Sequence, residues 1–192
     1  ASYGLDRWAD SSYWHMYKYA MSMQAIPEFS YNLSHMIKAV FGKNKKAFVL
    51  DLDNTLWGGI VGDDGAENLE LGQETPMGQV YQEFQSYIKA HKDLGIILNV
   101  NSKNEEENAI AGLNHPDGIL KPEDFIVIKA NWEPKSQNMA EIASTLNIGK
   151  DALVFVDDNP REREIVRVQV PEAAVPEITR GEELAPDKFI KI

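Results

Sequence analysis

Two aspartates follow a short apolar segment in the first third of the chain. The stretch AFVLDLDNTLWGG, residues 47–59, places Asp51 and Asp53 on either side of a single leucine. Residues i and i+2 of an extended chain point to the same side, so the two carboxylates would repel each other unless a cation or a chemical task accounts for them. The spacing therefore favours a site with chemistry over an ordinary acidic surface.

Polar and ionic side chains follow three further apolar segments in the same way. They are Asn101 and Ser102 after IILNV, Lys135 after DFIVIKA, and Asp157 and Asp158 after ALVFV. Because ligands of parallel sheets bind outside the carboxyl ends of the strands, these side chains are expected at one common rim. Four aspartates there could not all ionise without compensation. Oxygen-only ligands point to Mg²⁺ together with a substrate phosphate.

Two of these residues suit phosphate binding. Ser102 stands just before KNEEENAIAGL, so its hydroxyl and the amides that open this helix could hold phosphoryl oxygens, although it would serve equally as a helix cap. Lys135 could neutralise the phosphate and an attacking carboxylate. Lys129 is a rival for that role, but it lies inside the third strand pattern and is the poorer candidate.

The elements that must position these residues alternate along the chain. Strands are predicted at 46–53, 96–101, 124–130 and 152–158, and helices at 76–94, 104–113 and 137–147. Thr75 and Pro76 form a good helix start, and Gly95 and Gly149 are good stops. The alternation predicts an α/β fold, a doubly wound parallel sheet in three layers with helices on both faces.

Composition excludes several classes of protein and site. The 192 residues carry a net charge of -11 with 43% hydrophobic residues, an acidic globule without the basic stripe that nucleic-acid binding needs. There is no cysteine, so disulfides, thiolate metal sites and a cysteine nucleophile are excluded on this chain. No apolar run is long enough to span a membrane and no signal peptide is visible, so the expected location is cytoplasmic.

Residues 1–45 differ from the rest of the chain. They are rich in aromatic residues and methionine, look helical, and are interrupted at Pro27; Gly42 followed by KNKK is a helix stop. We therefore expect a helical lead-in at 1–45 and a sheet domain at 46–192. The chain begins at Ala1 and ends abruptly, so it is expected to be a piece of a longer protein with adjoining domains.

The order DxD, Ser, Lys, DD, with each motif at a strand end, resembles the haloacid dehalogenase (HAD) superfamily of Mg²⁺-dependent phosphotransferases over residues 46–178. The resemblance implies a Rossmann-like sheet with strand order 5-4-1-2-3. It implies that Asp51 is the nucleophile that becomes an aspartyl-phosphate and that Asp53 is the general acid and base. Ser102 matches the second motif and Lys135 the third.

The resemblance also implies which residues hold the metal and the phosphate. Mg²⁺ would be bound by a side-chain oxygen of Asp51, the main-chain carbonyl of Asp53 and a carboxylate of the acidic pair. Asp158 is the expected direct ligand, with Asp157 close behind, because the sequence does not say which of the two faces the ion. The substrate and its phosphate would contact Asn54, Thr55, Asn101, Ser102, Lys103, Trp132 and Lys135.

Two other kinds of acidic site fit less well. A response-regulator receiver domain has its acidic pair early and its lysine late, the reverse of the order here. In DDGAENLELGQE, Asp63 and Glu74 match the first and twelfth positions of an EF-hand loop, but Gly65 replaces the third ligand and Asn68 stands where the turn glycine belongs. We interpret this segment as a hairpin-like flap, with Trp57 at its edge, although Trp57 and Trp132 could equally be packing residues.

Longer stretches resemble one branch of the superfamily. The chain between Thr55 and Pro76 is too short for a cap domain, and a capless rim suits a carrier-borne or macromolecular substrate. DLDNTLWGGIVGDDG, NSKNEEEN, ANWEPKSQN, LNIGKDALVFVDDNPRERE and VPEAAVPEI closely resemble the FkbH-like family. That resemblance implies a phosphorylated glyceryl substrate, 1,3-bisphosphoglycerate, and transfer of the acyl group to an acyl carrier protein in polyketide-type biosynthesis.

One position departs from that branch. Many FkbH-like proteins have a cysteine where this chain has Asn101, so a thioester cannot form here. A stand-alone phosphatase and a non-catalytic Mg²⁺-binding domain remain the alternatives.

An acidic carrier protein would also need positive charge near the rim. The residues that could supply it are Lys103, Lys121, Lys129, Lys135, Arg161, Arg163 and Arg167, although a solvated face explains the arginines of PREREIVR equally well.

Overall fold

The computed structural model describes residues 8–178, and the chain divides into two compact units between Asn44 and Lys45. The first unit contains α2 (Ser11–Tyr17), a 3-10 turn (Met23–Ala25) and α3 (Ile26–Val40). Asp10 caps α2 by accepting a hydrogen bond from the N–H of Ser12. Pro27 stands in the first turn of α3, where its missing N–H leaves no bond unmade.

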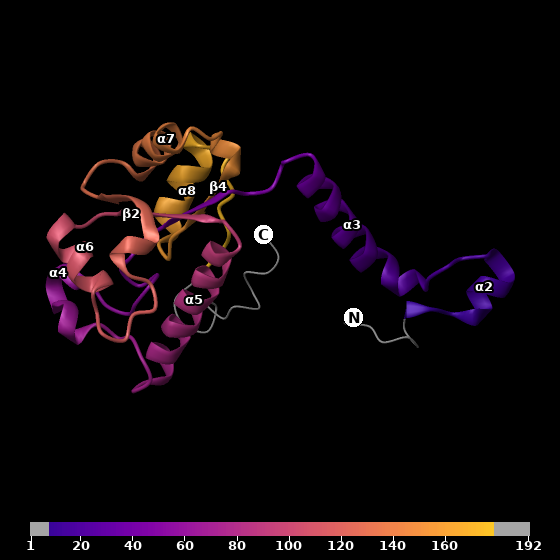
Figure 1. The fold of residues 1–192 in the computed structure, drawn as a ribbon, viewed down its shortest axis with the longest axis horizontal. Helices are drawn as coiled ribbons and strands as arrows, with labels where there is room; N and C mark the ends of the chain where they lie inside the picture. Colours follow the sequence, from indigo (N-terminus) through magenta and orange to yellow (C-terminus); the bar gives the residue numbers. More distant parts are fainter. Residues whose placement is uncertain (1–7, 179–192) are drawn as a thin grey trace. The chain divides into compact units, whose positions relative to one another are not determined.

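The second unit is a parallel sheet with helices on both faces (Figure 1). Its strands are β1 (Ala47–Leu50), β2 (Ile97–Ser102), β3 (Phe125–Ala130) and β4 (Leu153–Val156), and their pairings are parallel. Its helices are α4 (Val61–Asp64), α5 (Pro76–Asp93), α6 (Glu106–Leu113), α7 (Lys135–Leu146) and α8 (Pro160–Gln169), with 3-10 turns at Ala66–Asn68, Pro122–Asp124 and Lys150–Ala152. The predicted α/β fold is confirmed.

The strands lie in the order β3-β2-β1-β4, which is the 4-1-2-3 part of the expected order. Where the fifth strand is expected, the described chain forms one parallel bridge between Val154 and Ala174. The Ala174 carbonyl accepts from the N–H of Phe155, and its own N–H donates to Leu153. Residues 179–192, the end of the predicted sheet domain, lie outside the described part of the chain.

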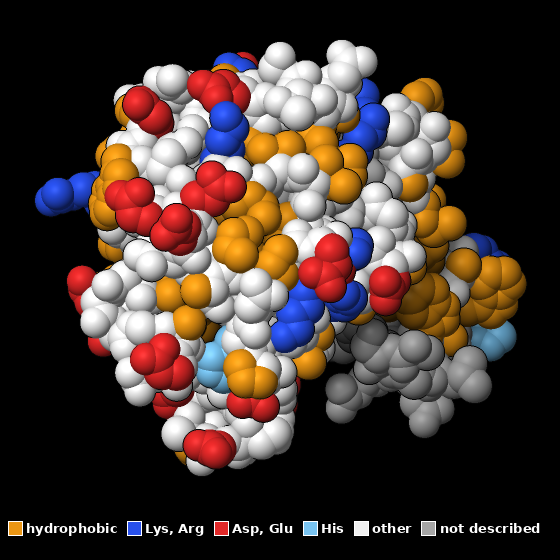
Figure 2. All heavy atoms as spheres, turned by 60° about the vertical axis from the view of Figure 1, so that its left-hand side comes forward, with side chains coloured by type: hydrophobic (Ala, Val, Ile, Leu, Met, Phe, Trp, Pro, Cys, Tyr) orange, Lys and Arg blue, Asp and Glu red, His pale blue; other side chains and the backbone are white. Residues whose placement is uncertain are grey.

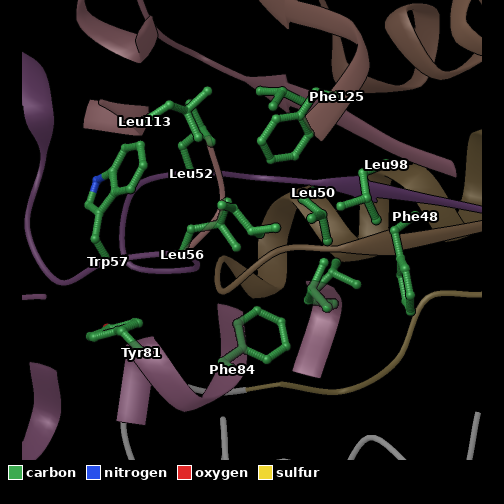
Figure 3. Close-up of a cluster of buried hydrophobic side chains, with 14 of the residues drawn as sticks. Phe48, Leu50, Leu52, Leu56, Trp57, Tyr81, Phe84, Leu98, Leu113 and Phe125 are labelled. Carbon is green, nitrogen blue, oxygen red and sulfur yellow. The ribbon is translucent and has the colours of Figure 1, made fainter. Parts of the chain in front are cut away.

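Two buried clusters account for the three layers. Successive residues of a strand point to opposite faces, so Leu50 joins the cluster that includes Phe84 of α5, shown in Figure 3. Val49 joins the cluster on the other face, which includes Ile142 of α7. All four residues of β1 are buried. The central strand is therefore fixed from both sides, and it carries Asp51 to the rim.

The segment expected as a hairpin-like flap is more compact than predicted. Gly58 and Glu70 form an antiparallel bridge that closes it as a hairpin would, but α4 and the turn Ala66–Asn68 fill the interior. Trp57 is not at an exposed edge, because its side chain is buried in the cluster of Figure 3. It packs against Gly112, where an added Cβ would lie 2.7 Å from the indole. The flap-edge prediction for Trp57 is wrong, since packing decides its position.

The surface agrees with the acidic composition. On the face shown in Figure 2, acidic and apolar side chains are spread widely, with basic side chains in small groups between them. Within residues 8–178, every helix falls short of the length or the apolar character that a membrane crossing requires.

Candidate active site

The carboxyl ends of the strands open on a pocket of about 620 Å³. Its lining includes eight of the predicted site residues: Asp51, Asp53, Asn54, Ser102, Lys103, Lys135, Asp157 and Asp158. They come from β1, β2, β4 and the start of α7 or from the turns that follow these strands, so the sheet brings together motifs that are far apart in the sequence. The other predicted site residues, Thr55, Asn101 and Trp132, lie outside this lining.

Lys135, the first residue of α7, lies between two buried carboxylates. Its Nζ is 2.8 Å from Asp51 Oδ1 and 2.6 Å from Asp157 Oδ2. Burial opposes the charge of Lys135, but the two carboxylates outweigh it, so its pKa is raised and the ammonium stays protonated. Burial and the charge of Asp51 raise the pKa of Asp157, and Lys135 offsets part of that rise. Lys129, the rival, instead pairs with Glu141.

Three carboxylates of the pocket can converge on a cation. One oxygen each of Asp51, Asp157 and Asp158 lies within 4.8 Å of the other two. With one lysine among them, this group keeps an excess of negative charge, and an oxygen-only donor set fits Mg²⁺. Both oxygens of Asp157 also accept hydrogen bonds, from Lys135 and from the N–H of Asn159. The donor set thus satisfies the expectation of a metal site at this rim.

Three donors hold the carboxylate of Asp53. Trp57 Nε1 and the N–H of Val61 each lie 3.0 Å from Oδ1, and Asn104 Nδ2 lies 2.7 Å from Oδ2. Burial raises the pKa of Asp53 even though these hydrogen bonds lower it. A carboxyl with a raised pKa suits proton transfer near neutral pH. Asn104 also donates to Ser102 Oγ at 3.3 Å, which links the first two motifs.

Asn54 and Thr55 shape the turn after β1. Asn54 has a φ of 56°, in the left-handed region that asparagine tolerates, and its Oδ1 accepts from the N–H of Gly59. Thr55 is fully buried, and its Oγ1 accepts from the N–H of Asp158 at 3.1 Å. Thr55 therefore links the turn after β1 to the acidic pair. This contact gives Thr55 a structural role, although its side chain is not part of the pocket lining.

The structure gives Asn101 and Trp132 positions outside the pocket. Asn101 is fully buried; its Nδ2 donates to the carbonyl of Lys135 at 2.9 Å, and its Oδ1 accepts from Asn138 at 3.0 Å. An amide can donate and accept at once in this way and a cysteine cannot do so with comparable strength, so Asn101 fixes the start of α7. Trp132 is 68% exposed, and its indole donates to Glu105.

Basic residues expected near the rim are largely engaged by carboxylates. Lys103 pairs with Glu162 at 2.6 Å, and Lys129 pairs with Glu141. Arg163 is buried, so a solvated face is the wrong interpretation for this arginine. Sequence reasoning missed Glu162 because its partner is far away in the chain. The positions of Asn104 and Trp57, close to Ser102 and Asp53 in the sequence, were the signals that could have revealed their roles.

Comparisons with known proteins agree with this geometry. The chain is similar to the N-terminal part of protein BF1531 from Bacteroides fragilis, a structure described as containing a phosphatase domain in complex with Mg, with 43% identity and a TM-score of 0.82. The match covers 98% of this chain and 50% of that one, so the chain spans about half the length of that solved chain. No protein-family model matches the chain, and no curated protein does either.

Two more distant structures bear the name of a fold family. They are the HAD domain of effector protein Lem4 from Legionella pneumophila, at 14% identity and a TM-score of 0.52, and the magnesium complex of HAD family enzyme bt-2542 from Bacteroides thetaiotaomicron, at 12% identity and a TM-score of 0.50. The matches cover 72% and 73% of this chain and 88% and 96% of those chains. The sheet unit has the HAD fold. Residues 51–75 of this HAD unit form only turns, isolated bridges and short helices, so no cap domain follows β1, as predicted.

Proposed function

We propose that the HAD unit, residues 46–192, is a Mg²⁺-dependent phosphatase or phosphotransferase that forms an aspartyl-phosphate on Asp51. The observation that carries the proposal is the placement of Asp51 beside the Lys135 ammonium and within one cation-binding group of carboxylates. The similarity to the phosphatase domain of BF1531, solved with Mg, supports it. Because the chain spans about half of that solved chain, we also propose that adjoining domains of a longer chain are partners of this unit.

Each residue of the pocket has its own role in a two-step transfer of the phosphoryl group. Asp51 attacks the phosphorus atom, so that a new oxygen–phosphorus bond forms on its carboxylate while the bond to the leaving group breaks. Asp53 supplies a proton to the leaving group where one is needed. In the second step Asp53 takes a proton from water, whose oxygen attacks the phosphorus, and inorganic phosphate leaves as Asp51 is regenerated. Ser102 and Lys103 line the pocket and would hold phosphoryl oxygens, and Lys135 balances their charge.

Mg²⁺ would be held by the carboxylates of Asp51 and Asp158 and by the main-chain carbonyl of Asp53, with Asp157 as the other possible carboxylate ligand. When bound, the ion stabilises the negative charge on the phosphoryl oxygens during transfer. The convergence of three carboxylates, two of which also pair with Lys135, supports this assignment.

For the substrate we propose a phosphorylated glyceryl unit such as 1,3-bisphosphoglycerate. The thiolate of an acyl carrier protein would attack its acyl carbon and displace inorganic phosphate, and Asp51 would attack the phosphoester at the other end of the unit. Attack of Asp51 on the acyl phosphate itself would release a free carboxylate, which cannot acylate a thiol. The stretches that resemble the FkbH-like family support this refinement, and the absence of a cap after β1 leaves room for a carrier arm. Trp132 is exposed beyond the pocket and could contact such a substrate or carrier. The pairing of Lys103 with Glu162 leaves less free positive charge for an acidic carrier than the sequence suggested.

A specific observation favours a second candidate, a phosphatase without acyl transfer. The chain has no cysteine, and Asn101 is buried behind the pocket, where it supports Lys135. The acyl group therefore has no thiol on this chain to which it could move. Transfer would have to go directly to the thiol of the carrier, or the acyl group would be released as a free acid.

The first test measures phosphate release from acetyl phosphate, 1,3-bisphosphoglycerate and p-nitrophenyl phosphate, with and without Mg²⁺. We expect turnover by the wild type that requires Mg²⁺, and none by Asp51→Asn. Asp63→Asn is the matched control, because Asp63 is exposed on α4 and should behave like the wild type. Undiminished, metal-independent turnover in Asp51→Asn would contradict the proposal.

A second experiment separates the two candidates. An acyl carrier protein bearing its phosphopantetheine arm is incubated with the enzyme and 1,3-bisphosphoglycerate, and its intact mass is measured. A carrier that gains a glyceryl group supports acyl transfer. Phosphate release with an unloaded carrier would establish the plain phosphatase instead.

A further inference from the structure

A buried arginine donates hydrogen bonds to the main chain of the acidic pair, Asp157 and Asp158. Arg163 of α8 is 2% exposed, and its Nη1 donates to the main-chain carbonyls of Asp157 and Asp158, both at 2.8 Å. Its Nη2 forms an ion pair with Glu177 at 3.0 Å. A guanidinium is costly to bury unless its donors are used. The contacts of Nη1 and Nη2 offset that cost for Arg163, whose buried Nε has no hydrogen-bond partner.

The start of α8 does not need these contacts. Asn159 caps the helix, because its Oδ1 accepts from the N–H of Arg161 at 3.0 Å, and its carbonyl accepts from the N–H of Arg163. The two carbonyls that Arg163 holds precede the helix. They belong to the peptide groups of Asp157 and Asp158, whose side chains line the pocket.

Holding both carbonyls has a consequence for the carboxylates. Neighbouring residues of an extended chain direct their side chains to opposite sides, yet Asp157 and Asp158 both place an oxygen within 4.8 Å of Asp51. The backbone must therefore turn between them. Two hydrogen bonds from one guanidinium nitrogen restrict that turn, as does the bond from the N–H of Asn159 to Asp157.

We propose that Arg163 is a positioning residue for the metal site, which keeps the turn at Asp157 and Asp158 in the shape that lets the acidic pair and Asp51 bind one divalent cation. This inference rests on the proposed function. Glu177 is the outer anchor, because its carboxylate pairs with both Arg163 and Arg167. The short segment that returns beside β4 thereby supports the metal site from behind.

Charge and geometry make opposite predictions for Arg163→Met. If the arginine acted only through its positive charge, its removal would strengthen the binding of a cation. If it acts by holding the turn, its removal weakens binding, and loss of an outer partner of metal ligands costs about tenfold or more in metal affinity. The direction of the change therefore decides between the two roles.

The test is calorimetric titration of the whole chain with Mg²⁺. We expect Arg163→Met to bind Mg²⁺ about tenfold more weakly than the wild type. Arg161→Met is the matched control, since Arg161 is exposed on the same helix and its variant should bind within about twofold of the wild type. Circular dichroism and thermal unfolding confirm that each variant is folded.

Two milder variants keep the test decisive if Arg163→Met does not fold. Arg163→Lys keeps the charge with a shorter reach, and Glu177→Gln weakens only the outer anchor; both should bind Mg²⁺ measurably more weakly than the wild type. Unchanged or tighter Mg²⁺ binding in any folded Arg163 variant would overturn the role of Arg163 alone. A wild type that binds no Mg²⁺ would overturn the proposed metal site as well.

Discussion

Two charge clusters of the HAD unit have the same arrangement with the signs of the charges reversed. In the pocket, Lys135 lies between the carboxylates of Asp51 and Asp157. Beside α5, the carboxylate of Asp124 lies between the ammonium groups of Lys89 and Lys92. One cluster keeps an excess of negative charge, and the other keeps an excess of positive charge.

The clusters differ in how that excess is met. Lys89 and Lys92 are each 35% exposed, so water solvates their charge, and Asp124 also accepts from the N–H of Lys121. In the pocket Lys135 is 4% exposed and Asp157 is fully buried. A buried excess charge is expensive unless it is paired. Ion pairing alone thus does not mark a site, whereas a buried group of carboxylates with a net negative charge is suited to bind a cation.

Among the substitutions that test this comparison, Lys135→Met should have the largest effect on turnover and on stability. Removing the ammonium takes away the charge that balances a transferring phosphoryl group, so we expect kcat to fall at least about a hundredfold. The two carboxylates left behind should also destabilise the fold by about 3–5 kcal/mol without metal, and Mg²⁺ should restore part of this. Phosphate-release kinetics and urea unfolding with and without Mg²⁺ check both effects. Wild-type turnover in the variant would break the account of the pocket.

Asp124→Asn should have the opposite profile. The variant loses charge-assisted hydrogen bonds from Lys89 and Lys92, but these lysines regain water, so we expect a loss of about 1–2 kcal/mol in the free energy of unfolding. Turnover per folded molecule should not change, because Asp124 is outside the pocket lining. Urea unfolding and kcat, measured on the same preparation, test this; a fall in kcat would show that the two clusters are coupled.

The pH dependence of the Asp124 contribution sharpens the comparison. Burial raises the pKa of Asp124, but hydrogen bonds from Lys89, Lys92 and Lys121 outweigh burial and hold it below its usual range. Its ionised form therefore stabilises the folded state above about pH 4, and this stabilisation is lost as the pH falls through the lowered pKa. The stability gap between wild type and Asp124→Asn should shrink below about pH 4. A gap that stays constant down to acidic pH would contradict the ion-pair explanation.

Lys129→Met should have the smallest effect. Lys129 pairs with a largely exposed Glu141, and surface ion pairs contribute little. Neither the midpoint of thermal unfolding nor the turnover with Mg²⁺ should shift measurably. A loss of activity comparable with that of Lys135→Met would mean that the wrong lysine has been assigned to the pocket.

Local patterns in the sequence were enough to predict the sheet and the meeting of its motifs. The apolar segment before Asp51 became β1, and the Thr55 to Pro76 spacing gave a unit without a cap. Boundaries moved where the backbone turned early. The first strand ends at Leu50, and the chain turns soon afterwards, where the N–H of Thr55 bonds to the carbonyl of Leu52. Helix α7 begins at Lys135, directly after Pro134.

Contacts between distant residues could not be predicted from spacing. Asn101 stands where a pocket residue was expected, but its amide bonds to Lys135 and Asn138 depend on how α7 packs against β2. The buried position of Arg163 depends likewise on carbonyls and on Glu177, whereas its sequence context fits a solvated helix face. Such supporting residues leave no periodic pattern in the sequence, because the position of each depends on a partner in another element.

The most direct measurement of the central claim is chemical trapping of the phosphoryl group on Asp51. The enzyme is incubated with Mg²⁺ and acetyl phosphate, quenched, and reduced with borohydride, which converts an aspartyl-phosphate into homoserine; peptide mass spectrometry then locates the change. The account predicts homoserine at position 51 in the wild type and no modification in Asp51→Asn. Sustained turnover with an unmodified Asp51, or modification at another aspartate, would contradict it.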